Sequence, residues 1–226
     1  MDGDKTAIIV AGGSGKRMQQ AVPKQFMLLQ DKPVLMHTLE RFYHFDMEME
    51  LIVVLPPTSL PDWKELVNQY NCRIPHTLVA GGHERYHSVK NGLQAVRKGR
   101  LIAVQDGVRP LVSQQTIAAA FKAAATYGAA VPAVAPKESL RQLTEAGSRA
   151  VDRRRYRMIQ TPQVFRSEIL QEAYQQPYRS FFTDDASLVE YAGYNIHLVE
   201  GNRHNMKITT PEDMDIARLF LKQESQ

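Results

Sequence analysis

The sequence predicts an α/β protein built on a Rossmann-like, mostly parallel β-sheet with helices on both faces. Three observations indicate this fold class. Short apolar runs alternate with segments of helical period along the first part of the chain, as in sheets whose strands are joined by helices. The 226 residues suit one α/β domain, and a hydrophobic content of 43% can bury a sizeable core. The first apolar run, Ala7 to Ala11, ends in a glycine-rich turn.

Each expected strand is a short apolar run, and most of these runs stop at glycine, proline or aspartate. The run from Leu51 to Leu55 stops at Pro56, for example, and its continuous apolar character suits a strand buried on both faces. The expected strands cover residues 7–11, 51–55, 76–80, 101–105, 129–134 and 196–200.

The expected helices carry apolar residues three and four positions apart. In the first of them Val34, Leu35 and Leu39 share one face, and Pro33 precedes it as a residue suited to a first turn. The last is expected to begin near Pro211, with acidic residues next to it that favour the positive end of a helix. The expected helices cover residues 34–45, 61–70, 88–98, 116–127, 167–174, 184–192 and 210–221.

Residues 139–165 interrupt this rhythm with a pattern closer to period two, around a turn at residues 145–148. A polar hairpin without an apolar face of its own is unstable alone. We therefore expect it to pack on something outside the chain, and a second copy of the chain is the economical choice. The predicted organisation is a single domain over residues 1–226, with a dimerisation arm at about 136–162.

Composition narrows the class of partner and the compartment. A net charge of +4 is too small an excess to argue for nucleic acid, because the basic residues fall in separate clusters. The single cysteine, Cys72, excludes an internal disulfide, and the histidines show no metal-ligand spacing. No apolar stretch approaches the length of a membrane span, and the charged residues before Ala7 leave no room for a signal peptide. We expect a cytoplasmic protein that binds neither nucleic acid nor membrane.

The glycine-rich turn at residues 12–15 is typical of an anion-binding site. Glycines let backbone N–H groups approach a phosphate chain, and cations at Lys16, Arg17 and Lys24 can neutralise its charge. The spacing does not fit a P-loop, because the Gly-Lys pair is followed by arginine, and a dinucleotide fingerprint would need glycine where Met18 stands. The turn resembles the signature loop of nucleotidyltransferases, in which a glycine-rich turn ending in arginine precedes a Pro-Lys pair.

Other polar clusters follow other expected strands. Gly81 to Arg85 follows one strand and Asp106 to Pro110 follows another, while Lys207 comes after the last strand. Ligands of open α/β sheets bind outside the carboxyl ends of the strands. The sequence therefore predicts that these clusters meet the glycine-rich turn at one edge of the sheet.

An ordered set of motifs then resembles one family across nearly the whole chain. The motifs are Gly-Gly-x-x-Arg-x-x-Ser from residue 81, Asp-x-x-Arg-Pro from 106, Val-Asp-Arg from 151, Thr-Pro-Gln from 161, Thr-Asp-Asp-Ala-Ser from 183, Val-Glu-Gly from 199 and Asn-x-Lys-Ile-Thr from 205. Together they resemble the 2-C-methyl-D-erythritol 4-phosphate cytidylyltransferases of the non-mevalonate isoprenoid pathway. The resemblance implies a glycosyltransferase-A-like nucleotidyltransferase fold. It also implies in-line attack of the substrate phosphate on the α-phosphate of CTP, which expels pyrophosphate.

The resemblance also implies roles for individual residues. Arg17 and Lys24 match the stabilisers of the transition state, and Arg153 and Lys207 match residues that position the attacking phosphate. The positions matching the CTP site are Ala11, Gly12, Gly13, Gly15, Lys24, Gly82, Arg85 and Ser88. Those matching the methylerythritol phosphate site are Asp106, Arg109, Ser139, Arg153, Thr183 and Lys207. Mg²⁺ is expected on the triphosphate, mainly through phosphate oxygens and water with Asp106 a possible ligand. In the family the arm reaches the neighbouring subunit's site in a homodimer.

Departures from the family pattern leave alternatives open. Gly107 stands where alanine is common, His83 where an acidic residue is common, and Ser139 where threonine is common, although serine keeps the hydroxyl. A ribitol 5-phosphate cytidylyltransferase shares the loop, the Asp-x-x-Arg-Pro and the Asn-x-Lys-Ile-Thr. The Thr-Asp-Asp-Ala-Ser and Val-Glu-Gly motifs favour methylerythritol phosphate. A catalytically silent nucleotide-binding module is a more distant alternative, and retention of Arg17 and Lys24 argues against it.

Overall fold

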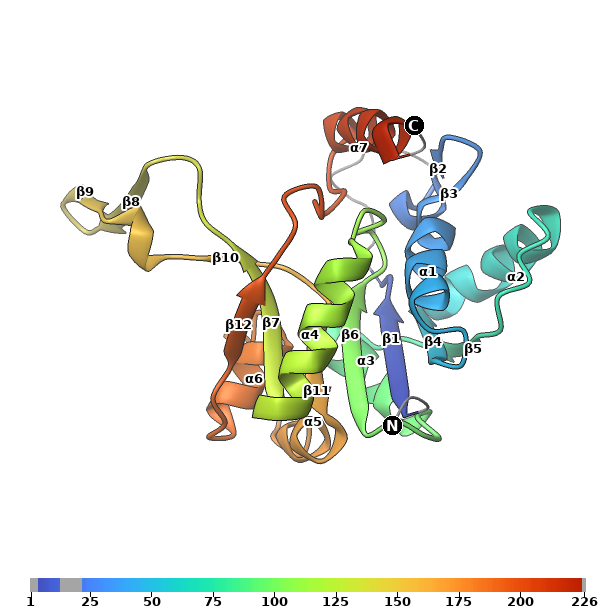
Figure 1. The fold of residues 1–226 in the computed structure, drawn as a ribbon, viewed down its shortest axis with the longest axis horizontal. Helices are drawn as coiled ribbons and strands as arrows, with labels where there is room; N and C mark the ends of the chain where they lie inside the picture. The colour runs from blue at the N-terminus through green and yellow to red at the C-terminus, as the bar shows by residue number, and fades with distance from the viewer. Residues whose placement is uncertain (1–3, 13–21, 225–226) are drawn as a thin grey trace.

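The computed structural model describes residues 4–12 and 22–224 (Figure 1). Over these residues eight strands form the central sheet, in the order β10-β7-β11-β6-β1-β4-β5, with β12 paired to β7. The strands are β1 (Lys5–Val10), β4 (Glu50–Leu55), β5 (Thr77–Ala80), β6 (Leu101–Asp106), β7 (Ala129–Val134), β10 (Met158–Ile159), β11 (Gln163–Arg166) and β12 (His197–Glu200). The β1, β4, β5 and β6 pairings and the β7–β12 pairing are parallel, whereas β10 and β11 run antiparallel to their neighbours. The predicted fold class is confirmed.

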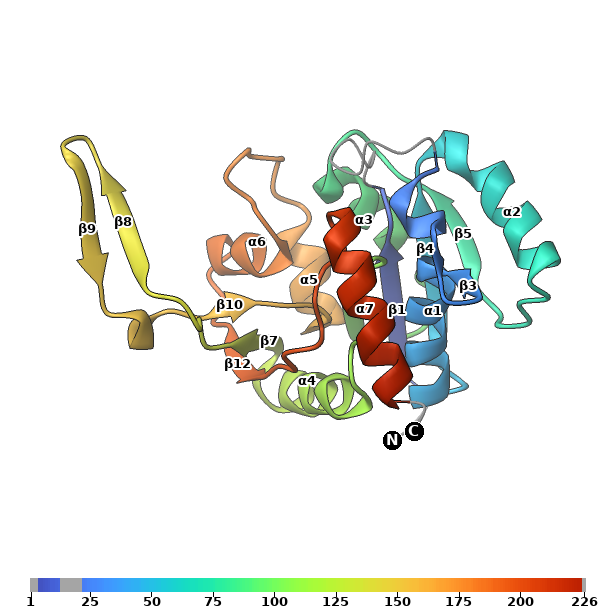
Figure 2. The same ribbon diagram turned by 90° about the horizontal axis from the view of Figure 1, so that it is seen from above.

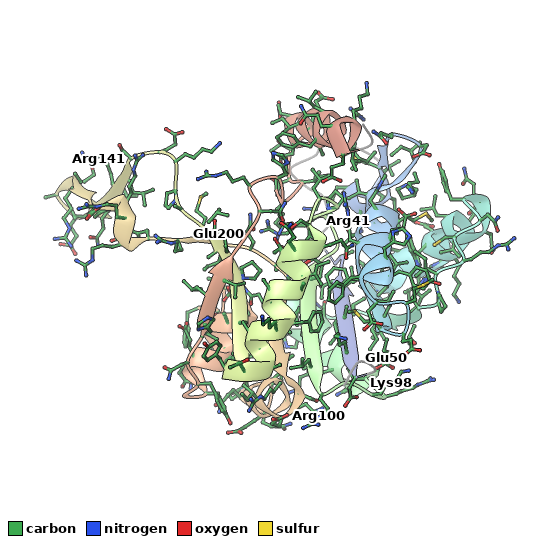
Figure 3. The ribbon with its side chains drawn as sticks, viewed as in Figure 1. Arg41, Glu50, Lys98, Arg100, Arg141 and Glu200 are labelled. Atoms are coloured by element: carbon green, nitrogen blue, oxygen red, sulfur yellow. The ribbon has the colours of Figure 1, made fainter. Side chains whose placement is uncertain are left out.

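Register aligns the strand ends that matter for function. Val10, at the end of β1, lies opposite Val54 of β4 and Asp106 of β6. The carboxyl ends of these strands therefore share one edge of the sheet, which is the upper edge in Figure 1. At the opposite edge Figure 3 shows Glu50, Lys98 and Arg100 gathered near one another.

Helices cover both faces of the sheet because successive strand residues point to opposite sides. Ile9 of β1 packs in a core with α1 (Val34–Phe45), α2 (Leu60–Gln69) and α4 (Gln114–Tyr127). Ile8 packs in a second core with α3 (Arg85–Gln94), α5 (Ser167–Ala173) and α6 (Asp185–Tyr191). A glycine at position 92 lets α3 approach the sheet, because a Cβ there would lie 2.7 Å from Cγ2 of Ile8.

The last helix, α7 (Pro211–Glu224), lies over the carboxyl edge of the sheet (Figure 2). Its Met214, Ala217 and Leu221 form a third apolar cluster with residues that include Leu29 and Ile208. The short elements near this edge are the 3-10 helix η2 (Lys24–Phe26) and the strands β2 (Leu28–Leu29) and β3 (Lys32–Pro33). No helix within the described ranges is long and apolar enough to cross a membrane.

The period-two segment contains two different structures. Its first part is a two-stranded hairpin, β8 (Leu140–Thr144) with β9 (Gly147–Val151), which projects away from the rest of the molecule in Figures 1 and 2. Arg141, labelled in Figure 3, lies on this projection. The second part returns through the 3-10 helix η4 (Arg153–Arg155) to β10 and β11, and β11 is buried between β6 and β7. The sequence pattern did not separate these two parts, because both have the period of a strand.

A second difference concerns α3, which was expected to begin at Ser88 and begins at Arg85. The apolar face of the expected helix began at Val89 and left out Tyr86. Tyr86 is also buried, and it stacks on Tyr174 with ring centroids 5.0 Å apart. The earlier start turns Arg85 and Ser88 into neighbours one helical turn apart at the end of the helix nearest the carboxyl edge of the sheet.

Candidate active site

A cleft of about 300 Å³ lies at the carboxyl edge of the sheet, as the clusters of glycines and cations predicted. The ends of β1 and β6, the turn after β5, the first turn of α3, η2 and the segment before α7 all contribute to it. Its lining consists of Val10, Ala11, Gly12, Lys24, Gln25, Gly82, His83, Glu84, Arg85, Ser88, Asp106, Val108 and Lys207. Segments that are far apart in the sequence therefore form one site.

The turn after β5 is held tightly against α3. The backbone N–H of Gly82 donates to Oγ of Ser88 at 3.1 Å, and the N–H of Gly81 donates to the carbonyl of Leu55 at 2.8 Å. A Cβ added at Gly82 would overlap the Cβ of His87. Glycine at this position thus keeps the turn in the space that the Ser88 hydrogen bond defines.

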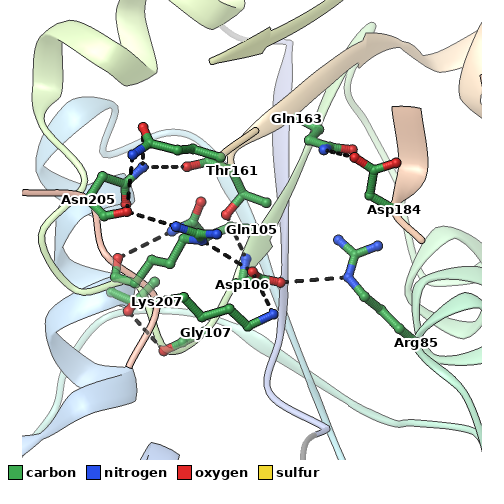
Figure 4. A network of polar contacts seen from close by, with 12 residues as sticks. Arg85, Gln105, Asp106, Gly107, Thr161, Gln163, Asp184, Asn205 and Lys207 are labelled. Atoms are coloured by element: carbon green, nitrogen blue, oxygen red, sulfur yellow. Dashed lines mark hydrogen bonds and ion pairs between the residues drawn. The ribbon is translucent and has the colours of Figure 1, made fainter. Parts of the chain in front are cut away.

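Asp106 is the centre of the site's charge. Its Oδ2 lies 3.0 Å from Nζ of Lys207 and 3.2 Å from Nε of Arg109, and its Oδ1 lies 3.6 Å from Nε of Arg85 (Figure 4). Burial alone would raise the pKa of this carboxyl group. The neighbouring Arg85, Lys207 and Arg109 outweigh burial and hold its pKa well below the usual range, so Asp106 is a carboxylate at neutral pH.

Contacts with the last loop fix Arg109 beside Asp106. The Nη1 group of Arg109 donates to the carbonyl of Asn205 at 2.7 Å, and the buried amide of Asn205 donates to the carbonyl of Thr161 at 2.8 Å. The hydroxyl of Thr161 in turn accepts from the backbone N–H of Asp106 at 3.1 Å. Figure 4 shows how these contacts join the end of β6 to the loop that carries Lys207.

Arg85 has a second acidic partner on α6. Its Nη2 donates to Oδ2 of Asp185 at 2.6 Å, and Oδ1 of Asp185 accepts from the hydroxyl of Tyr174 at 2.6 Å. Burial opposes the charge on Arg85, but Asp185 and Asp106 raise the pKa of the guanidinium above its usual value. Burial and the adjacent Asp185 also raise the pKa of Tyr174, so its hydroxyl keeps its proton and donates to the carboxylate.

The structure brings together most of the predicted site residues that it describes. Ala11, Gly12, Lys24, Gly82, Arg85, Ser88, Asp106 and Lys207 line the cleft, and Arg109 contacts Asp106 behind it. Thr183 is exposed and lies beside Arg85 at a smaller pocket before α6. Gly13, Gly15 and Arg17 lie outside the described residues, and their predicted roles stay predictions.

Ser139 and Arg153 do not join the cleft of their own chain. Both are exposed and belong to the projecting segment, where Arg153 donates to the carbonyl of Lys137. Their predicted contact with substrate remains a prediction that depends on a partner subunit.

Several supporting residues escaped the sequence interpretation. Asp185 accepts hydrogen bonds from both Arg85 and Tyr174. Gln163 binds Asp184 at the start of α6, and the carbonyl of Asn205 accepts from Arg109. Some of these residues belong to the family motifs, but no local pattern indicates that a buried acid on one helix pairs with an arginine on another.

Two residues that depart from the family pattern can also be located. His83 lines the cleft, and a Cβ at Gly107 would lie 2.8 Å from the Cβ of Ala11.

No cluster of three or more potential metal ligands exists among the described residues. Asp106 is already surrounded by three cations, which weakens it as a ligand for a divalent ion. A metal in this cleft would therefore fit best on the oxygens of a bound phosphate chain, where Mg²⁺ commonly sits.

The comparison with known families decides among the nucleotidyltransferases. Residues 6–223 match the model of the family described as 2-C-methyl-D-erythritol 4-phosphate cytidylyltransferase. The chain belongs to this family. The predicted resemblance and the predicted enzyme class, a cytidylyltransferase, are both confirmed.

Curated relatives carry the same name over nearly the whole chain. A 2-C-methyl-D-erythritol 4-phosphate cytidylyltransferase of Porphyromonas gingivalis is 50% identical over 223 residues, which cover 98% of this chain and 99% of the relative. One of Bacteroides fragilis is 48% identical over 217 residues, covering 96% of this chain and 99% of the relative.

Solved structures agree in fold. A 4-diphosphocytidyl-2C-methyl-D-erythritol synthase of Anaerococcus prevotii superimposes with a TM-score of 0.81 at 27% identity, covering 98% of this chain and all of that one. The 2-C-methyl-D-erythritol 4-phosphate cytidylyltransferase of Thermus thermophilus gives a TM-score of 0.78 at 30% identity, again over 98% of this chain and all of that one. The sheet and its carboxyl-edge cleft are thus set in the fold of this cytidylyltransferase family.

Proposed function

We propose that the chain transfers CMP from CTP to 2-C-methyl-D-erythritol 4-phosphate, giving 4-diphosphocytidyl-2-C-methyl-D-erythritol and pyrophosphate. The observation that best supports this proposal is that glycine turns at Gly12 and Gly82 line one cleft together with Lys24, Arg85 and Lys207, in a chain of this family. Backbone N–H groups and cations gathered at strand ends suit two phosphate-bearing ligands.

The reaction asks mainly for positioning and charge stabilisation, because a phosphate monoester is already a competent nucleophile. Lys24 lines the cleft and is only 9% exposed. In the proposed mechanism it lies beside the triphosphate and, together with Arg17, stabilises the charge that develops at the α-phosphate. Lys207, with its ammonium group 3.0 Å from Asp106, positions the attacking phosphate. The predicted roles of Gly82, Arg85 and Ser88 toward cytidine belong to the same proposal.

Mg²⁺ belongs to the proposal as a companion of CTP. It would be held mainly by phosphate oxygens and water, and it would offset charge on the triphosphate and the departing pyrophosphate. The crowded surroundings of Asp106 make that carboxylate a secondary ligand at most. A cytoplasmic location stays a prediction.

The direct test is pyrophosphate release from CTP and Mg²⁺ by the purified protein. Methylerythritol 4-phosphate and ribitol 5-phosphate are offered in parallel, with ATP, GTP and UTP as nucleotide controls. We expect release with methylerythritol phosphate and CTP. A preference for ribitol phosphate would refute the substrate assignment and keep the chemistry, whereas no release with either alcohol would refute the enzymatic proposal.

The two proposed transition-state cations give a second test. Lys24→Ala and Arg17→Ala are each expected to lower kcat by two or more orders of magnitude, since loss of one preorganised charge typically costs about 10²–10³ in rate. Circular dichroism should show the fold retained. Normal turnover in either variant would remove that residue from the mechanism.

We also propose that the protein is a homodimer in which each arm, at about residues 136–162 of a single catalytic domain, reaches the site of its partner. Exposed apolar side chains on the arm support this proposal: Leu143 is 83% exposed, Met158 49% and Tyr156 44%. Large apolar side chains exposed together on one projecting segment are typical of a surface that another protein covers. Ser139 and Arg153, which stand outside their own chain's cleft, would then complete the partner's site.

Subunit mixing tests this exchange. A chain with Arg153→Ala keeps an intact cleft, and a chain with Lys24→Ala keeps an intact arm. If arms are exchanged, random mixing of the two inactive variants restores about a quarter of wild-type activity, because half of the dimers contain one complete site. Sedimentation velocity gives the oligomeric state independently. A monomer at assay concentration, or no recovery in mixed dimers, would contradict the proposal.

A further inference from the structure

A buried acid on α6 holds the arginine that enters the cleft from α3. Asp185, the first residue of α6, is fully buried, and its Oδ2 lies 2.6 Å from Nη2 of Arg85 although the two residues are 100 positions apart in sequence. Its other carboxylate oxygen accepts from the hydroxyl of Tyr174 at 2.6 Å, and Tyr174 is itself 3% exposed. Both oxygens of the carboxylate are therefore engaged, and Asp185 does not line the cleft itself.

The start of α6 is itself rigidly attached to the sheet. Asp184 caps the helix by accepting from the backbone N–H of Ser187 at 2.9 Å. The amide of Gln163, on β11, donates to Oδ2 of Asp184 at 2.7 Å and accepts from the backbone N–H of Ala186 at 2.9 Å. Asp185 thus occupies a fixed point between two residues that the sheet holds in place.

This fixed carboxylate competes with Asp106 for Arg85. The Arg85 guanidinium lies 2.6 Å from Asp185 but 3.6 Å from Asp106, whose carboxylate has closer contacts with Lys207 and Arg109. With Asp185, three cations share two carboxylates. Without its charge, the same three cations face Asp106 alone, and Arg85 is drawn toward it and away from its present position in the cleft.

We infer that Asp185 is a positioning residue, which acts through Arg85 to set the affinity of the cleft for CTP. It does so by keeping the guanidinium on the α6 side of the cleft, apart from the Asp106–Lys207 pair. The identity of the ligand rests on the proposed function. The placement of Arg85 by Asp185 rests on the geometry alone.

The test compares CTP binding, measured by titration calorimetry with Mg²⁺, in the wild type and in Asp185→Asn. Asparagine keeps the shape and can still hydrogen-bond both Tyr174 and Arg85, so that chiefly the charge is lost. We expect the CTP dissociation constant to rise about tenfold to a hundredfold, the range typical of a lost charge-assisted hydrogen bond. Glu190→Gln, the same chemical change at an exposed position of α6, should leave it within about twofold.

A double-mutant cycle separates positioning from general damage to the fold. In an Arg85→Met background, adding Asp185→Asn should change CTP affinity by less than about threefold, because the residue through which Asp185 acts is gone. The double variant also removes both charges of the pair, so no buried charge is left alone. Equal weakening in both backgrounds would show that Asp185 does not act through Arg85.

Tyr174→Phe provides a milder variant in case Asp185→Asn folds poorly. It removes one hydrogen bond to the Asp185 carboxylate and keeps the ring stacked on Tyr86. We expect a smaller loss of CTP affinity, about threefold to tenfold, which also disappears in the Arg85→Met background. An unchanged affinity in both Tyr174→Phe and Asp185→Asn would overturn the inference.

The binding measurement also keeps this inference apart from the proposed function. If the wild type binds CTP but does not use methylerythritol phosphate, the proposed substrate is wrong and the CTP comparison still decides the role of Asp185. A wild type that does not bind CTP overturns both.

Discussion

Replacing Asp106 by asparagine removes the negative charge on which three cations of the cleft converge. At an effective dielectric constant of about 20, unit charges 3 to 4 Å apart attract by about 4–5.5 kcal/mol. Solvent screening weakens the attraction between Lys207 and Asp106, because the Lys207 side chain is 40% exposed. The desolvation of the buried charged groups opposes the remaining attraction by several kcal/mol. Breaking buried pairs typically costs about 3–5 kcal/mol. Because one of the three partners is exposed and Asp185 still neutralises Arg85, we expect a loss of about 2–4 kcal/mol in unfolding free energy.

The pH dependence of this loss follows from the lowered pKa of Asp106. A carboxyl group whose pKa is depressed in the folded state stabilises the protein at pH values above its unfolded pKa of about 4, and this contribution is lost as pH falls through the folded value. The difference between wild type and Asp106→Asn should therefore be constant from about pH 5 to pH 8 and shrink below about pH 4.

Urea unfolding followed by circular dichroism at pH 7 and pH 5 measures the loss, and a further series at the lowest pH with a folded baseline measures its decline. Asp215→Asn is the matched control, because Asp215 forms an exposed pair with Arg218 and its loss should change the unfolding free energy by less than about 1 kcal/mol. Surface substitutions usually change the unfolding free energy by less than about 0.5 kcal/mol. An unfolding free energy of Asp106→Asn within that range of the wild-type value would refute this account of the network.

Three further predictions concern residues outside the charge network. Gly92→Ala adds a Cβ 2.7 Å from Ile8, so overpacking of about 1–3 kcal/mol should exceed the helix-propensity gain of about 1 kcal/mol; a urea midpoint above that of wild type would contradict this. Asp213→Ala removes an acceptor for the backbone N–H groups of Thr209 and Thr210 before α7 and should cost about 1–2 kcal/mol in thermal unfolding at pH 7, which an unchanged Tm would exclude. Burial raises the pKa of the Cys72 thiol. Its alkylation by iodoacetamide at pH 7, monitored by mass spectrometry, should therefore be slower than that of a cysteine in an unfolded peptide.

Much of the fold could be predicted because its signals are local. The expected helix at 34–45 and strand at 129–134 agree with α1 and β7 to the residue. The largest error arose where one local pattern fits two environments. Residues 139–165 have a pattern closer to strand period, yet β8 and β9 are exposed while β11 is an interior strand of the sheet. Only the neighbours of a strand decide which of these it becomes.

The candidate site shows the same division. Glycines and cations at Gly12, Lys24, Gly82 and Lys207 could be singled out from sequence, because turn residues and phosphate-binding cations keep a recognisable spacing. The partner of Arg85 could not be identified from sequence, because either Asp184 or Asp185 could cap a helix and no local pattern tells which of them binds an arginine. In the structure Asp184 does cap α6, while Asp185 turns to Arg85.

Local sequence patterns were enough to predict the succession of strands and helices, the turns at the strand ends and the membership of this cytidylyltransferase family. These depend on neighbouring residues and on motifs whose order along the chain is preserved. It took the folded chain to show that Asp106 faces Arg85, Arg109 and Lys207 and that Asp185 binds Arg85 from another helix. Those contacts depend on the order and register of strands β4, β1, β6 and β11, which are set by packing between distant segments and not by any local preference of the chain.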